Sequence, residues 1–136
     1  MKSVIEACLV GLILLGGARA QDSQRIALRP GVSVQMPVAG NAVEMGAADE
    51  PNATVVAITA DGKVFVGIKA TEPGDLSKLI DQTVYVKADS RVQYQRVVTV
   101  LDALRGKSVV LLTAPPVNTV RQGIVPPYGM RLILSR

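Results

Sequence analysis

Apolar and polar residues alternate with a period of two in the first regular stretch of the chain. In GVSVQMP, residues 31–37, two valines and a methionine alternate with polar residues until a proline ends the pattern. Residues 54–60 and 63–68 are two further β-branched runs, separated by Asp61-Gly62, the favoured pair of a type I′ turn. We therefore expect a strand from residue 31 to Pro37 and a two-stranded hairpin over 54–68.

A short helix is predicted after this hairpin. In TEPGDLSKLID, residues 71–81, Thr71 suits a helix cap and Pro73 suits the first turn. The segment allows only about two turns, so the helix must pack on the sheet to persist. The stretch TVYVKA, residues 83–88, then reads as another strand of the same core.

The most extended helical pattern follows that strand. Over residues 94–104 the apolar positions recur at intervals of three and four, and Gly106 is placed to end the helix. SVVLLTA, residues 108–114, is a fully apolar and therefore central strand. Strand, helix and strand form a βαβ unit with parallel strands and a right-handed crossover. The predicted buried stripe of the helix consists of Tyr94, Val97, Val98, Leu101 and Leu104.

These elements predict an α+β domain over residues 31–113. We expect two layers, with a mixed sheet of about four to six strands and two helices on one face. Residues 114–136 form a proline-rich tail that ends in RLILSR, a possible edge strand. An exposed sheet edge is a template for another strand, so the terminal strand either completes its own sheet or contacts a second chain. The residues concerned are Arg131, Leu132, Ile133 and Leu134.

The first 20 residues have the layout of a secretory signal peptide. An apolar run of eleven residues, Ala7–Gly17, follows Lys2 and precedes Ala18-Arg19-Ala20, a pattern that predicts cleavage after Ala20. Residues 21–30 would then be a polar spacer. The alternative is an uncleaved inner-membrane anchor facing the periplasm, although a spanning helix needs roughly 20 apolar residues.

The residue inventory argues against catalysis. The chain has no histidine, and its single cysteine, Cys8, lies inside the predicted signal peptide. The commonest general base, thiolate chemistry and zinc-thiolate sites are therefore not expected. We predict no enzyme, no catalytic or metal site, no cofactor and no small-molecule substrate. Fifteen basic residues against eleven acidic ones give a net charge of +4, but they are scattered, so no nucleic-acid partner is expected.

Two residues near the start of the longer helix are candidates for partner contact. Asp89 follows the 83–88 strand and either touches a partner, accepts main-chain N–H groups in its turn, or helps to cap the helix. Tyr94 is expected as a packed ring with its hydroxyl at the surface, and it too could touch a partner.

The region from residue 31 to 113 resembles the periplasmic domain of the ExbD/TolR biopolymer-transport family. The resemblance rests on the order and spacing of GVSVQMP, ITADGKVFVG, VYVKADSRVQYQRVVTVLDALRG and VVLLTAPP. Family members show an I-x-A-D phrase before a tyrosine that opens a helix, matched here by Val86–Asp89 and Tyr94. The chain departs from the family in lacking a PLVDVML-like membrane phrase with its aspartate, and its helix before the 83–88 strand is shorter.

The resemblance implies a component of a proton-motive-force-linked envelope transport system. Its periplasmic domain would act by protein–protein contact rather than by proton relay, because Glu6 is the only acid in the N-terminal apolar segment and lies near its start rather than inside the run. The implied partners are a second copy of the chain and TonB/TolA-like or ExbB/TolQ-like envelope proteins. The alternative is a free-standing periplasmic module that binds another ligand or the cell wall.

Overall fold

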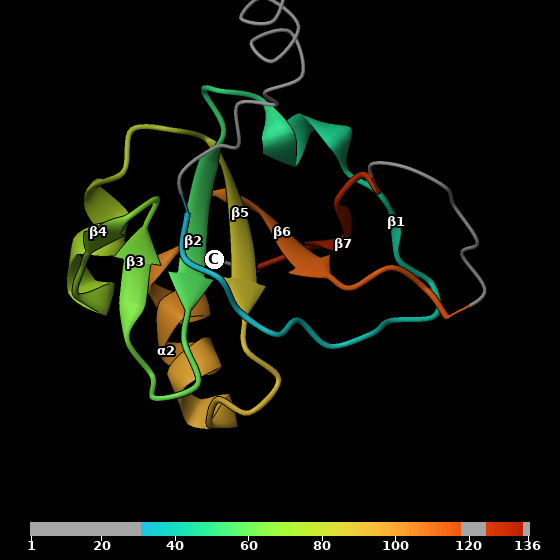
Figure 1. The fold of residues 1–136 in the computed structure, drawn as a ribbon. Coiled ribbons are helices and arrows are strands. Elements are labelled where there is room, and N and C mark those ends of the chain that lie inside the picture. Colours follow the sequence, from blue (N-terminus) through green and yellow to red (C-terminus); the bar gives the residue numbers. More distant parts are fainter. Residues whose placement is uncertain (1–30, 118–124, 135–136) are drawn as a thin grey trace, which may run out of the picture.

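The computed structural model describes residues 31–117 and 125–134, which form one seven-stranded mixed sheet with helical segments packed on it (Figure 1). The strand order is β1-β7-β6-β5-β2-β3-β4. The predicted signal peptide and spacer, and residues 118–124 and 135–136 of the tail, lie outside the described residues. The strands are β1 (Val43–Glu44), β2 (Thr54–Ile58), β3 (Val64–Val66), β4 (Lys69–Ala70), β5 (Thr83–Ala88), β6 (Ser108–Thr113) and β7 (Tyr128–Leu132).

The α+β class is confirmed, but the predicted numbers of strands and helices are wrong. The described part of the chain has one α-helix, α2 (Tyr94–Ala103), and two 3₁₀ segments, η2 (Gly46–Asp49) and η3 (Pro73–Lys78). The expected helix at 71–81 is therefore a 3₁₀ helix of six residues. Strands β1 and β4 have two residues each, which is too short for a period of two to be visible in the sequence.

The βαβ unit has parallel strands, as predicted. Strand β5 pairs with β6 in parallel, with Val84 opposite Val109, and α2 connects the two strands. On its other side β5 pairs in parallel with β2. Strand β6 lies between β5 and β7, in agreement with its uninterrupted apolar sequence.

The β2–β3 hairpin forms, but its turn is not type I′. A type I′ turn needs positive φ at both central residues, and only Gly62 has it, at +84°. The main-chain N–H of Gly62 donates to the carbonyl of Thr59 at 2.9 Å, so the loop has three residues and ends in a left-handed glycine. The Thr59 hydroxyl donates to the Asp61 carboxylate, a local contact made with Asp61 in an ordinary backbone conformation.

The strand predicted for residues 63–68 ends early. Gly67 has a φ of +63° and reverses the chain, so that β4 folds back antiparallel on β3. This short return strand covers the outer side of β3.

The alternating segment at residues 31–37 is not a strand, which corrects the prediction. Its valines and Met36 are half-buried, and Met36 packs against a small buried cluster that contains Val110 and Leu112. Only the next residue, Val38, forms an isolated bridge, with Ala114. The alternation therefore reflects burial against a sheet face rather than ladder pairing. We call residues 31–38 the N-terminal strap.

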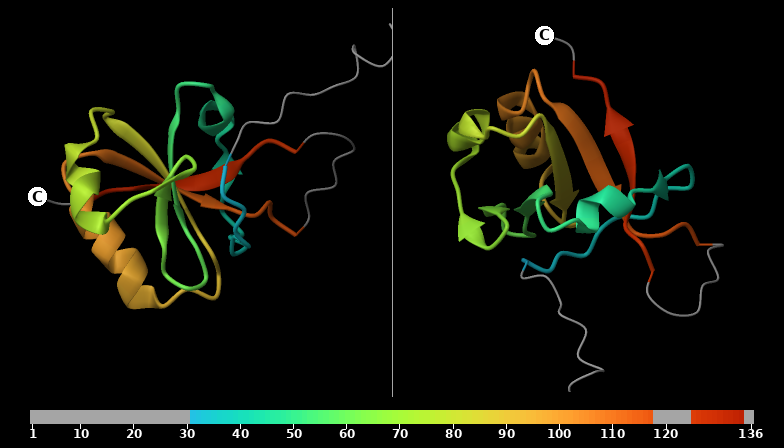
Figure 2. Two further views of the ribbon diagram at one scale, coloured as in Figure 1. Left: turned by 60° about the vertical axis from the view of Figure 1, so that its left-hand side comes forward. Right: turned by 90° about the horizontal axis from the view of Figure 1, so that it is seen from above.

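The main hydrophobic core lies between one face of the sheet and the pair α2 and η3 (Figure 2). Leu76 of η3, Val100 of α2 and Leu104 just after α2 are fully buried there. The opposite face carries a smaller cluster formed by Ala48, Val110 and Leu112. Successive residues of β6 therefore pack in different clusters, with Val109 in the main core and Val110 in the smaller cluster.

The buried face of α2 differs from the predicted stripe. Leu104 is buried as predicted, but Tyr94 is 83% exposed and Val98 is 43% exposed. At about 100° per residue, Tyr94 and Val98 lie about 80° and 120° around the helix from Leu104, whereas Val100 lies about 40° away. The face that packs on the sheet is centred between Val100 and Leu104, and Leu101 is only half-buried.

Candidate protein-contact site

Asp89 ties together segments that are distant in sequence. It is 4% exposed and begins the turn between β5 and α2, residues 89–92, which we call the Asp89 turn. Its carboxylate accepts the main-chain N–H of Arg91 at 3.0 Å and that of Gln35 in the strap at 3.1 Å. Its own N–H donates to the carbonyl of Ile58 at 2.9 Å. Through its side chain and its main-chain N–H together, Asp89 is therefore a junction between the strap, β2 and the Asp89 turn.

The electrostatics of Asp89 follow from these contacts. The Arg91 guanidinium donates from Nε at 2.9 Å and from Nη2 at 3.0 Å. This guanidinium, with the main-chain N–H groups of Arg91 and Gln35, holds the pKa of the Asp89 carboxyl well below its usual range. No side-chain hydrogen bond caps α2 at Gln93. The carboxylate is directed inward in this arrangement, and its role in partner contact stays a prediction.

Tyr94 is the first residue of α2, and its side chain lies on the solvent-exposed face of the helix. The expectation of a packed ring is wrong, because 83% of the residue is exposed. Val98, one turn further along, is the other exposed apolar residue on α2. Tyr94 is therefore accessible for contact, and that role also stays a prediction.

The C-terminal strand begins earlier than RLILSR and is partly sheltered. Strand β7 pairs with β6 along its whole length, and β1 covers only Tyr128 and Gly129 on its outer side. Beyond Gly129, no strand in the described ranges pairs with that outer side. Arg131 and Leu132 lie in β7, whereas Ile133 and Leu134 follow it. Leu132 and Leu134 pack against the core, while Ile133 is 99% exposed.

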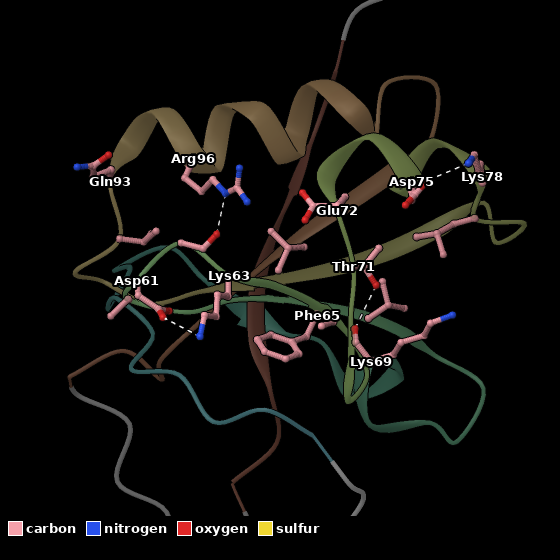
Figure 3. A pocket seen from close by; sticks show the side chains of 17 residues that line it. Asp61, Lys63, Phe65, Lys69, Thr71, Glu72, Asp75, Lys78, Gln93 and Arg96 are labelled. Carbon is pink, nitrogen blue, oxygen red and sulfur yellow. Dashed lines mark hydrogen bonds and ion pairs between the residues drawn. The ribbon is translucent and has the colours of Figure 1, made fainter.

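A groove of about 990 Å³ lies at the opposite end of the sheet (Figure 3). It is bounded by the β3–β4 hairpin, η3 and the first turn of α2. Its charged lining includes Lys63, Lys69, Glu72 and Arg96. The sequence does not predict this groove. Its walls come from separate elements, and no contiguous sequence motif indicates a binding site there.

The described residues bring together no obvious chemistry. No group of three or more potential metal-ligating side chains occurs within residues 31–117 and 125–134. In the same ranges, no helix combines the length and apolar character that crossing a membrane requires. The accessible features include the exposed Tyr94, the outer side of β7 and the groove at the β3–β4 end.

Comparison with known proteins identifies the family. The family described as "Biopolymer transport protein ExbD/TolR" matches residues 18–115. The comparison with curated proteins gives no match. The family match covers most of the chain, includes the whole βαβ unit and ends two residues after β6.

Proposed function

Because the chain belongs to the ExbD/TolR family, a family of non-enzymatic components of biopolymer transport, we propose that it serves a proton-motive-force-linked envelope transport system. It acts by protein–protein contact through its periplasmic domain rather than by proton relay. Its partners are a second copy of the chain and TonB/TolA-like or ExbB/TolQ-like envelope proteins. The family match is the observation that carries this proposal.

The proposal against proton relay rests on the N-terminal sequence. A carboxylate inside a membrane is costly and usually functional. Glu6 is the only acid among residues 1–20, and it precedes the apolar run rather than lying within it. We propose that residues 1–20 are an export signal cleaved after Ala20, so that the domain works in the periplasm. Intact-mass measurement of the exported protein checks this, since retention of Met1 would contradict cleavage.

The proposed self-contact uses the outer side of β7. An uncovered strand edge can accept another strand through main-chain hydrogen bonds. The uncovered stretch starts after Gly129 and leads to Ile133, which is 99% exposed. Two copies placed antiparallel along this edge would form a two-fold contact in which each Ile133 is buried by the partner.

Sedimentation equilibrium of the full chain tests this contact. Ile133→Lys should weaken self-association at least about tenfold, because burying an isoleucine contributes about 1.5–3 kcal/mol and lysine opposes edge pairing. Ile80→Lys is the matched control, since Ile80 is 92% exposed and lies away from β7. Equal association of both variants and the wild type would overturn the β7 contact.

A further inference from the structure

The groove at the β3–β4 end of the sheet has the dimensions of a binding site. Its volume of about 990 Å³ lies at the upper end of the range for ligand pockets, about 300–1,000 Å³. It extends along the hairpin from Asp61 at the β2–β3 turn to the Asp75–Lys78 pair on η3 (Figure 3). An elongated, open groove of this kind suits an extended chain better than a compact molecule.

The groove combines an apolar base with a charged rim. Val64 is buried, and Val66, Leu79 and Val92 are partly buried against the main core while also lining the groove. The same elements that close the core therefore leave part of their apolar surface facing the groove. Apolar side chains of a bound segment would pack there.

Two ion pairs neutralise the two ends of the rim. Lys63 pairs with Asp61 at 3.5 Å, and Lys78 pairs with Asp75 at 2.8 Å. Arg96, Lys69 and Glu72 remain between them, and none of these three forms an ion pair with another residue in the described ranges. The unpaired charges of the lining are thus two positive and one negative.

Arg96 is held in place for recognition. It is half-buried on α2, and its Nε donates to the carbonyl of Gly62 at 2.7 Å. That bond fixes the guanidinium against the β2–β3 turn, and Figure 3 shows the side chain directed from α2 into the groove. The two Nη groups have no hydrogen-bond partner among residues 31–117 and 125–134. A fixed guanidinium with free N–H groups matches a carboxylate in geometry and charge.

We propose that this groove binds an extended segment of a partner protein that places an acidic side chain on Arg96. Apolar residues of the segment flank the acid and pack on the groove base, and Glu72 accepts main-chain N–H groups of the segment. This inference rests on the proposed function, because it assumes that the ligand of the groove is another protein. The groove is nevertheless separate from the β7 contact, because β3–β4 and β1–β7 lie at opposite ends of the sheet.

NMR titration of the ¹⁵N-labelled full chain tests the proposal. The probe is a short acetylated and amidated peptide of alternating valine and threonine with one central glutamate, compared with the same peptide carrying glutamine. We expect shifts at Gly62, Glu72 and Arg96, and at least about tenfold tighter binding of the glutamate peptide, the effect of one charged hydrogen-bonded pair. The difference should shrink at high salt.

Variants of the protein provide the matched control. Arg96→Gln should abolish the preference for glutamate. Arg105→Gln should preserve it, because Arg105 lies just beyond α2, outside the groove lining, and pairs with Asp102 at 2.8 Å. The two peptides on unaltered protein already test recognition, so a folding defect of Arg96→Gln would not obscure the result.

Several results would overturn the groove assignment. These are equal affinity for the two peptides, shifts confined to other surfaces, or no shifts at all. Acetate that binds as tightly as the glutamate peptide would show a simple anion site instead. If the chain is monomeric while the glutamate peptide still binds through Arg96, the β7 contact fails and the groove stands.

Discussion

Asp89 forms hydrogen bonds both within its own turn and to a segment that is distant in the sequence. Its position between a strand and a helix predicts a turn-forming aspartate, and its bond to the Arg91 N–H agrees with that expectation. The bond to Gln35, 54 positions earlier in the chain, could not be predicted, because the strap was expected to be a strand. The Asp89 side chain thus adds to the two main-chain hydrogen bonds that hold the strap, from the Ser90 N–H to the Gln35 carbonyl at 2.8 Å and from the Ala114 N–H to the Pro37 carbonyl at 2.9 Å.

Acid titration should reveal the contribution of Asp89. Its folded pKa is lowered, so its stabilising effect is present above the unfolded pKa of about 3.9 and is lost as pH falls further. We expect the free energy of unfolding of the wild type to drop between about pH 5 and pH 2. Asp89→Asn should be less stable at neutral pH and should show a flatter acid dependence in urea denaturation.

Asp102→Asn serves as the control for this titration. Asp102 forms an exposed ion pair with Arg105, and exposed pairs contribute little. Its acid profile should follow that of the wild type. If the free energy of unfolding fell with pH equally in Asp89→Asn and in the wild type, the proposed stabilising role of the Asp89 carboxylate would be contradicted.

At the scale of elements, periodicity predicted most of the longer strands and α2, but it did not distinguish a paired strand from the extended segment at residues 31–37. Strands β2, β5 and β6 and helix α2 have enough residues for their period to emerge, and their order fixed the βαβ unit. The two-residue strands β1 and β4 depend on tertiary pairing alone. The orientation of α2 was misjudged because Tyr94 and Val98 fit the apolar spacing yet lie off the face that meets the sheet.

Alanine substitutions along α2 test its observed orientation. Leu104→Ala should lower the free energy of unfolding by about 2–5 kcal/mol, the usual range for a buried leucine, because Leu104 is fully buried. Leu101→Ala should cost less, since Leu101 is half-buried. Tyr94→Ala should change stability by about 0.5 kcal/mol or less, as for an exposed site. Urea midpoints would exclude the observed orientation if Tyr94→Ala proved as destabilising as Leu104→Ala.

At the scale of the whole molecule, the sheet presents different surfaces at its two ends. The β7 side offers main-chain groups and the exposed Ile133, whereas the β3–β4 side offers a groove with a fixed arginine. One chain could therefore meet a second copy and a different partner at the same time. The sequence predicted the family, and the contact role of the C-terminal region stays a prediction. The groove could not be predicted, because it depends on the packing of three elements that only folding brings together.

Co-purification from the native cell envelope tests the central claim most directly. The full chain, carrying a short C-terminal tag, would be captured from gently solubilised envelopes, and the associated proteins would be identified by mass spectrometry against an untagged control. The account predicts enrichment of a multi-span ExbB/TolQ-like protein or a TonB/TolA-like protein. Recovery of folded, exported chain with neither class of protein enriched would contradict a role in envelope transport.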